Sequence, residues 1–144
     1  MFFMSDNVNT KNMQCGNPTP CIMVVDDAED ILLIIKMRLE EENLKVDIFS
    51  SAKSALEAFE CHFPDYDYYN LVLTEITLPD MNGFALYLYM REKNPYMKIA
   101  FMTTVDMQFE EVRDIIPAIE LNDRIKKPFH IDDLATQIRY NLES

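Results

Sequence analysis

Short apolar runs alternate with segments of helical periodicity along most of the chain. Cys21 to Val25 is a continuous apolar run that ends at two aspartates, a pattern typical of a strand buried on both faces of a parallel sheet. The predicted strands are residues 21–25, 46–49, 71–75, 98–103 and 123–127. The spacing of apolar residues predicts helices over 29–42, from the Ser51 cap through Phe59, and over 83–93, 106–115 and 131–142. This alternation indicates an α/β fold with a parallel sheet and helices on both faces.

The remaining segments are predicted to be loops or tails. Residues 1–20 contain four Asn and two Pro with little periodic apolar content, so we expect a disordered N-terminal tail. Residues 62–70, and the Pro79 to Gly83 stretch, have the composition of loops. One domain is expected over 21–144, and no output domain is expected because the chain ends just after its last helix.

The charge balance restricts the partners of the chain. Asp and Glu total 25 against 13 Lys and Arg, giving a net charge of -12. Such a chain repels nucleic acids and anionic membranes, whereas a basic protein surface or a divalent cation fits it. Three cysteines without metal-ligand spacing indicate free thiols, and no apolar run approaches the ~20 residues of a membrane span. These features predict a cytoplasmic protein.

Charged and hydroxyl residues follow the predicted strands. They are Asp26 and Asp27 after the first strand, Glu75 at the third, Thr103 and Thr104 at the fourth, and Lys127 at the fifth. The carboxyl ends of parallel strands share one edge of the sheet, where ligands bind. Carboxylates there suit Mg²⁺, and the ammonium and hydroxyl suit a phosphoryl anion. Each residue alone has a commoner explanation as a turn, cap or loop residue, but their joint placement favours a metal-assisted phosphoryl site or its relic.

Four motifs resemble those of response-regulator receiver domains of the single-domain chemotaxis type. They are Val24–Asp27, Leu71–Gly83, Phe101–Thr104 and Lys126–Phe129, which occur in the family's order within residues 21–142. The resemblance implies a flavodoxin-like, doubly wound sheet of five parallel strands in the order 2-1-3-4-5. It also implies a histidine kinase, a downstream signalling protein, or both as partners. Enzymatic activity would be limited to weak self-phosphorylation and dephosphorylation.

The resemblance assigns roles to individual residues. It implies that Asp26, Asp27 and the backbone carbonyl of Thr77 bind Mg²⁺. It further implies that Thr103 and Lys127 contact the phosphoryl group, and that residues 105–119 with the last helix form the partner surface.

Three positions depart from the family pattern. Glu75 replaces the phosphate-accepting Asp, Thr104 replaces a small residue, and Arg124 replaces the aromatic switch residue. The Glu75 carboxylate lies one methylene further from the backbone, and a misplacement of about 1 Å can cost about 100-fold in rate. We therefore expect poor acyl-phosphate formation, pairing of Glu75 with Lys127, and altered output switching.

Three functions are compatible with these residues. The first is an atypical module of two-component phosphorelay signalling, either constitutively active or switched without phosphate. The second is a working phosphoacceptor served by a histidine kinase. The third is a Mg²⁺-dependent phosphohydrolase, which is disfavoured because neither histidine of the chain, His62 or His130, ends a predicted strand.

Overall fold

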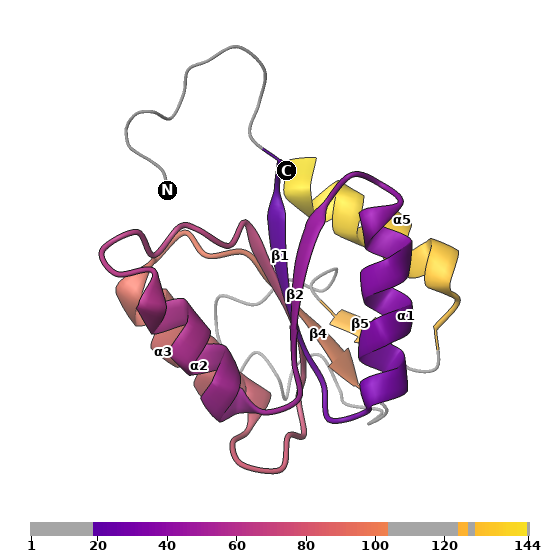
Figure 1. The fold of residues 1–144 in the computed structure, drawn as a ribbon. Coiled ribbons are helices and arrows are strands. Elements are labelled where there is room, and N and C mark those ends of the chain that lie inside the picture. Colours follow the sequence, from indigo (N-terminus) through magenta and orange to yellow (C-terminus); the bar gives the residue numbers. More distant parts are fainter. Residues whose placement is uncertain (1–18, 104–123, 127–128, 144) are drawn as a thin grey trace.

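The computed structural model describes residues 19–103, 124–126 and 129–143 (Figure 1). Five parallel strands form one sheet in the order β2-β1-β3-β4-β5. The strands are β1 (Cys21–Val25), β2 (Lys45–Phe49), β3 (Leu71–Glu75), β4 (Ile99–Thr103) and β5 (Arg124–Lys126). The helices are α1 (Glu29–Glu40), α2 (Ala52–Cys61), α3 (Gly83–Lys93) and α5 (Ile131–Glu143). None of the helices in this part of the chain combines the length and the apolar character that crossing a membrane requires.

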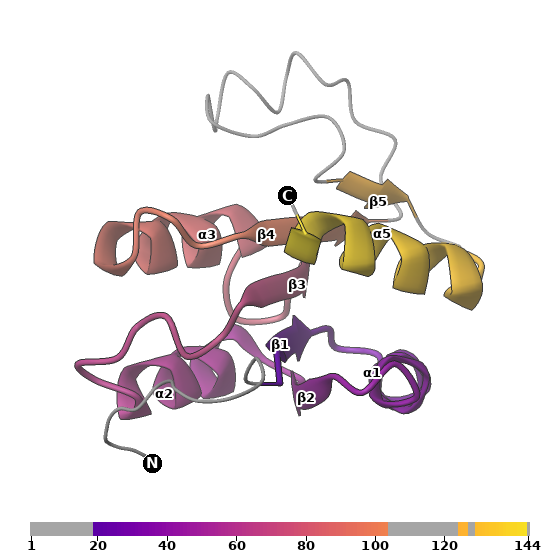
Figure 2. The same cartoon turned by 90° about the horizontal axis from the view of Figure 1, so that it is seen from above.

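The helices cover the sheet on both faces. Figure 2 shows α2 and α3 on one face and α1 and α5 on the other. Side chains of β1 alternate between the two layers: Met23 and Val25 pack in the cluster with α2 and α3, whereas Ile22 and Val24 pack with α1 and α5. All five residues of β1 are buried, which agrees with the continuous apolar run seen in the sequence.

The predicted parallel α/β sheet is confirmed, including the order of its first four strands. β5 is described over three residues, whose backbone pairs with β4. The predicted helix over 106–115 and residues 1–18 of the predicted tail lie outside the described residues. Helix α1 ends at Glu40 rather than at residue 42, because the acidic run that follows is unfavourable at a helix C-terminus. The turn is completed by Asn43, which has a positive φ of 64°.

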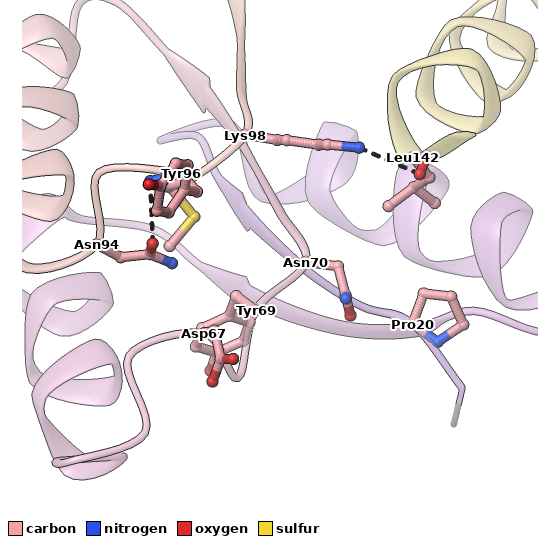
Figure 3. A pocket seen from close by; sticks show the side chains of 9 residues that line it. Pro20, Asp67, Tyr69, Asn70, Asn94, Tyr96, Lys98 and Leu142 are labelled. Carbon is pink, nitrogen blue, oxygen red and sulfur yellow. Dashed lines mark hydrogen bonds between the residues drawn. The ribbon is translucent and has the colours of Figure 1, made fainter. Parts of the chain in front are cut away.

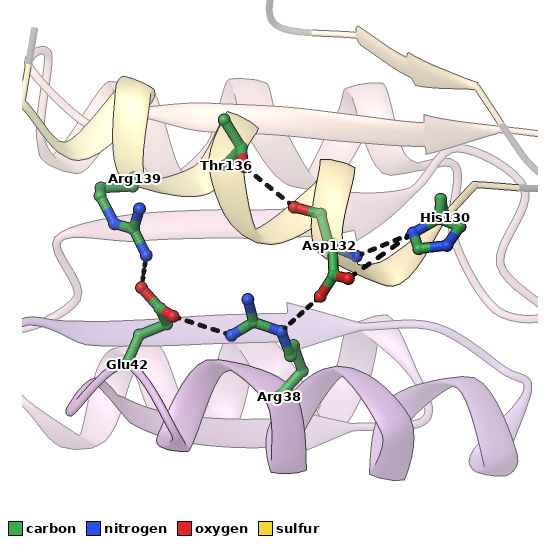
Figure 4. Close-up of polar contacts among 6 residues, drawn as sticks. All are labelled: Arg38, Glu42, His130, Asp132, Thr136 and Arg139. Atoms are coloured by element: carbon green, nitrogen blue, oxygen red, sulfur yellow. Dashed lines mark hydrogen bonds and ion pairs between the residues drawn. The ribbon is translucent and has the colours of Figure 1, made fainter.

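An ion-pair cluster joins α5 to α1 (Figure 4). The Arg38 guanidinium lies 2.9 Å from a carboxylate oxygen of Asp132 on α5 and 2.9 Å from one of Glu42, just after α1. Arg139 of α5 pairs with the same Glu42. Because these groups are partly exposed, each pair is worth about 0.2–1 kcal/mol, and the cluster adds orientation to the apolar packing beneath it.

Candidate functional site at the carboxyl edge of the sheet

The register of the sheet brings Asp26 and Glu75 to neighbouring positions. Val25 of β1 pairs with Thr74 of β3, so the next residues on the two strands are Asp26 and Glu75. Adjacent strands lie about 4.8 Å apart, and both side chains are buried, with exposed fractions of 0% and 6%. Two buried carboxylates are therefore placed side by side at the predicted edge.

The same register extends across β4 and β5. Glu75 pairs with Met102, and Thr103 pairs with Lys126. Thr103 therefore follows, on β4, the residue that pairs with Glu75. The backbone order of the predicted site is thus Asp26, Glu75 and Thr103 on successive strands, with Lys126 at the end of β5.

Thr103 and Arg124 are described by their backbone, and both lie on the strands expected from the sequence. Thr104 and Lys127 lie outside the described residues. The expected pairing of Glu75 with Lys127 therefore stays a prediction.

The Glu75 carboxylate turns back onto the loop that follows β3. Its Oε2 atom accepts hydrogen bonds from the backbone N–H groups of Ile76, at 2.8 Å, and Thr77, at 3.3 Å. Two successive amides directed at one oxygen form a small anion-binding concavity. The negative charge of Glu75 is held there by the chain itself.

The two aspartates after β1 have different surroundings. Asp26 is buried, its Oδ1 accepts from the Ala28 N–H at 2.9 Å, and its own N–H donates to the Phe49 carbonyl at 3.1 Å. Asp27 is exposed. Asp26 therefore acts as a turn residue, which is the commoner explanation named for this pair in the sequence. Asp27 is the aspartate that faces solvent.

The loop between β3 and α3 is held tightly to the end of β3. Thr77 pairs with Asn82 in an isolated antiparallel bridge, and the Gly83 N–H donates to the Ile76 carbonyl at 2.6 Å. A Cβ on Gly83 would lie 3.0 Å from the Cα of Ile76 and 3.2 Å from the carbonyl carbon of Glu75. Glycine thus lets the start of α3 rest directly on the backbone that carries Glu75.

Sequence reasoning identified the composition of this loop but missed its contacts. Asn82 caps α3 by accepting from the Phe84 N–H at 2.7 Å, and Asp80 accepts from two amides of α2. The Asn82–Gly83 pair signalled a loop before a helix, which is confirmed. The contact between Asp80 and α2 spans 28 residues of sequence and therefore leaves no local pattern.

The atoms available at this edge are oxygens, the ligand type that Mg²⁺ prefers. The predicted ligands are the carboxylates of Asp26 and Asp27 and the Thr77 carbonyl, all of them oxygens, and Mg²⁺ commonly uses one or two carboxylates. A bound cation would also reduce the repulsion between the neighbouring buried carboxylates of Asp26 and Glu75. Over 19–103, 124–126 and 129–143, no three His, Cys, Asp or Glu side chains come together closely enough to hold a metal. A site on the described residues must therefore include backbone oxygen or water.

A hollow of about 360 Å³ lies at the opposite edge, where the strands begin (Figure 3). Two of its polar side chains, those of Lys98 and Asn70, form hydrogen bonds within the fold. Lys98 donates to the carbonyls of Asn141 and Leu142 at the end of α5, and Asn70 accepts from the Cys21 N–H at 2.8 Å. The bonds from Lys98 tie the start of β4 to α5, and the bond to Asn70 ties the start of β1 to the segment before β3.

Comparisons with known proteins agree with this geometry. The response regulator receiver domain family matches residues 22–139. Response regulator ArlR of Staphylococcus saprophyticus is 30% identical over 118 residues, which are 82% of this chain and 50% of ArlR. Transcriptional regulatory protein TrcR of Mycobacterium tuberculosis is 25% identical over 118 residues, 82% of this chain and 43% of TrcR. The chain thus spans about half the length of these curated relatives.

Solved structures give the same result. A CheY-like response regulator receiver domain protein from Methanospirillum hungatei JF-1 has a TM-score of 0.75 and 30% identity, covering 88% of this chain and 95% of its own. The non-phosphorylated HemR receiver domain of Leptospira biflexa has a TM-score of 0.73 and 25% identity, covering 88% of this chain and 96% of its own.

Proposed function

The chain belongs to the family of response regulator receiver domains, and from this premise we propose that it is an atypical receiver that signals without phosphorylation. A receiver domain is a non-enzymatic module of two-component signal transduction, so the phosphohydrolase alternative has no support.

One observation carries this proposal: the Glu75 carboxylate lies on the amides of Ile76 and Thr77. A negative charge is thereby fixed at the end of β3 without a phosphodonor. Glu carries one negative charge, whereas a phosphoryl group carries about 1.5 to 2. Glu75 would therefore replace only part of the charge of a phosphoryl group. The placement of this carboxylate supports a receiver held close to its active arrangement.

The same geometry argues against phosphorylation of Glu75. Attack on a phosphodonor requires a carboxylate oxygen about 3–3.5 Å from phosphorus and in line with the leaving group. The Oε2 atom is instead directed at the loop backbone, and the side chain is 6% exposed. A working phosphoacceptor remains the second candidate, and the acidic pair Asp26–Asp27 is the feature that favours it.

Receiver domains typically bind Mg²⁺, and in this chain Asp26, Asp27 and the Thr77 carbonyl would hold it. When bound, the ion neutralises charge between the carboxylates and a phosphoryl oxygen. Asp27 is the exposed member of the set. Its substitution is therefore the least disruptive way to remove a ligand.

A histidine kinase, a downstream signalling protein, or both are the partners proposed for the chain. Apolar side chains on the outer face of α1 support docking of another protein, since Leu33, Ile34 and Met37 are 54%, 50% and 67% exposed. This face differs from the partner surface expected from the resemblance, which was residues 105–119 with the last helix. Residues 105–119 fall within the segment that is not described. The net charge of -12 favours a partner with a basic surface.

Phosphorylation is tested with acetyl phosphate and Mg²⁺, followed by intact mass. We expect no phosphoryl group on the wild type, and we expect Glu75→Asp to acquire one. The double variant Glu75→Asp with Asp27→Asn is the control, because it restores the acceptor but removes a metal ligand. A stoichiometric acyl phosphate on wild-type Glu75 would show that the second candidate is correct.

The active-like arrangement is tested by NMR. The amide signals of residues 76–83 in the wild type should match those of Glu75→Asp loaded with beryllofluoride. They should differ from those of unloaded Glu75→Asp and of Glu75→Gln, which keeps the length of the side chain without its charge. Wild-type signals that match the unloaded variants would refute constitutive activation.

A further inference from the structure

The Asp80 carboxylate is bonded to a helix that lies far from it in sequence. Its Oδ1 accepts from the Ala52 N–H at 3.0 Å, and its Oδ2 accepts from the Lys53 N–H at 2.8 Å. These are the first two residues of α2, whose amides have no partner within the helix. Asp80 thus accepts hydrogen bonds from two helix amides at once, although Asp80 is exposed to solvent.

A second, local cap completes the start of α2. The Ser51 hydroxyl accepts from the Ser54 N–H at 3.2 Å. Ser51 and Asp80 therefore serve the same helix terminus, one from within the segment and one from the β3–α3 loop. The two caps differ in what they connect. Ser51 caps α2 from its own segment, whereas Asp80 caps α2 and also joins it to the β3–α3 loop.

Asp80 also occupies the middle of the loop that carries Thr77. The loop begins at Thr77, whose amide donates to Glu75 of β3. It ends at Asn82, which is held by its bridge to Thr77. The bonds from Asp80 fix the tip of the same loop to α2. Removing them would release the tip while both of its ends stay attached.

We propose that Asp80 is a positioning residue, which sets the backbone of Thr77 beside Glu75 by fixing the β3–α3 loop to the start of α2. This inference rests on the proposed function for its meaning in signalling, since Thr77 supplies a proposed ligand to Mg²⁺. A displacement of α2 would thereby move the site, and a ligand at the site would change the start of α2.

The chemistry of Asp80 supports this role. Hydrogen bonds from the backbone of Lys53 and of Ala52 lower the pKa of the Asp80 carboxyl below its ordinary value. The ionised form is thus the one that the helix binds, in keeping with the positive end of the α2 dipole. The coupling is present at neutral pH.

The role is tested by comparing Asp80→Ala with Ser51→Ala. Both variants remove a cap from α2, but Asp80→Ala alone releases the loop. We expect Asp80→Ala to shift the NMR signals of the Ile76 and Thr77 amides in the metal-free protein and to weaken Mg²⁺ binding about 10-fold, as loss of an outer-shell contact does. Ser51→Ala should leave both unchanged.

Asp80→Asn gives a graded result, because it retains one acceptor oxygen of the two. The NMR signal of the Thr77 amide in Asp80→Asn should lie between its positions in the wild type and in Asp80→Ala. If Asp80→Ala and Ser51→Ala leave the Thr77 amide equally unchanged, or shift it equally, Asp80 is a helix cap and nothing more, and the proposal is overturned.

The outcome is separable from that of the proposed function. If the wild type binds no Mg²⁺, the proposed metal site fails, yet the amide signals of the metal-free variants still decide whether Asp80 positions the loop. If Mg²⁺ binds equally well to the wild type and to Asp80→Ala, with unchanged Thr77 signals, the metal site stands and the positioning role fails.

Discussion

Replacement of Gly83 by alanine tests whether the start of α3 must rest on the backbone of Glu75. In an open helix this change adds about 0.5–1 kcal/mol of stability, because alanine loses less conformational freedom on folding. Here the new Cβ would lie 3.0 Å from the Ile76 Cα and even closer to the Glu75 carbonyl oxygen. Both neighbours are backbone atoms, so no side-chain rotation relieves the contact.

The magnitude follows from the two opposing effects. Forcing one extra methyl into a packed site costs about 1–3 kcal/mol. Subtracting the midpoint of the gain in helix propensity from the midpoint of this cost, we expect Gly83→Ala to lose about 1 kcal/mol of unfolding free energy. For a chain near 150 residues, each kcal/mol lowers Tm by about 2–4 °C.

Urea unfolding followed by circular dichroism measures this change. Ala85→Gly is the matched control, because Ala85 is exposed in the first turn of the same helix. It reports the intrinsic difference between the two residues there and should lose about 0.5–1 kcal/mol. A Gly83→Ala protein as stable as the wild type, or more stable, would refute the close approach of α3 to β3.

Four further outcomes are expected. Asn82→Ala should lose about 1 kcal/mol of unfolding free energy, measured by urea titration, because α3 loses its N-terminal cap; no loss would mean that the cap is replaced. Burial raises the pKa of the Cys21 thiol to about 11, so iodoacetamide at pH 8 should modify the exposed Cys61 and spare Cys21 in folded protein, as checked by peptide mass. This raised pKa also means that the contribution of Cys21 to stability is complete below pH 9 and is lost towards pH 11, which alkaline unfolding curves can refute. A double-mutant cycle on Arg38 and Asp132 should give a coupling of about 0.2–1 kcal/mol that declines with salt; a coupling insensitive to salt would contradict a partly exposed ion pair.

The strands could be predicted well because burial on both faces leaves a plain signal. β1 and β3 are apolar runs that end in carboxylates, and each lies where the pattern placed it. The alignment of Asp26 with Glu75 followed as well, since parallel strands bring their carboxyl ends to one edge. The existence of these strands was thus encoded locally, whereas their order in the sheet came from the resemblance to receiver domains.

The details of the site could not be predicted in the same way. Asp26 and Asp27 are adjacent and identical in chemistry, but alternation along the chain buries one and exposes the other. The direction of the Glu75 carboxylate depends on its rotamer and on the loop amides that receive it. The contact between Asp80 and α2 depends on tertiary packing, which no short stretch of sequence encodes.

The alternation of β1 side chains between the two helical layers has a consequence for how the domain unfolds. Met23 belongs to one apolar cluster and Ile22 to the other, and β1 bonds to a strand on each side. Neither layer can unfold alone without exposing one face of β1, an interior strand of the sheet, to water. The two layers should therefore be lost together in a single all-or-none transition, and damage to either one weakens the whole domain.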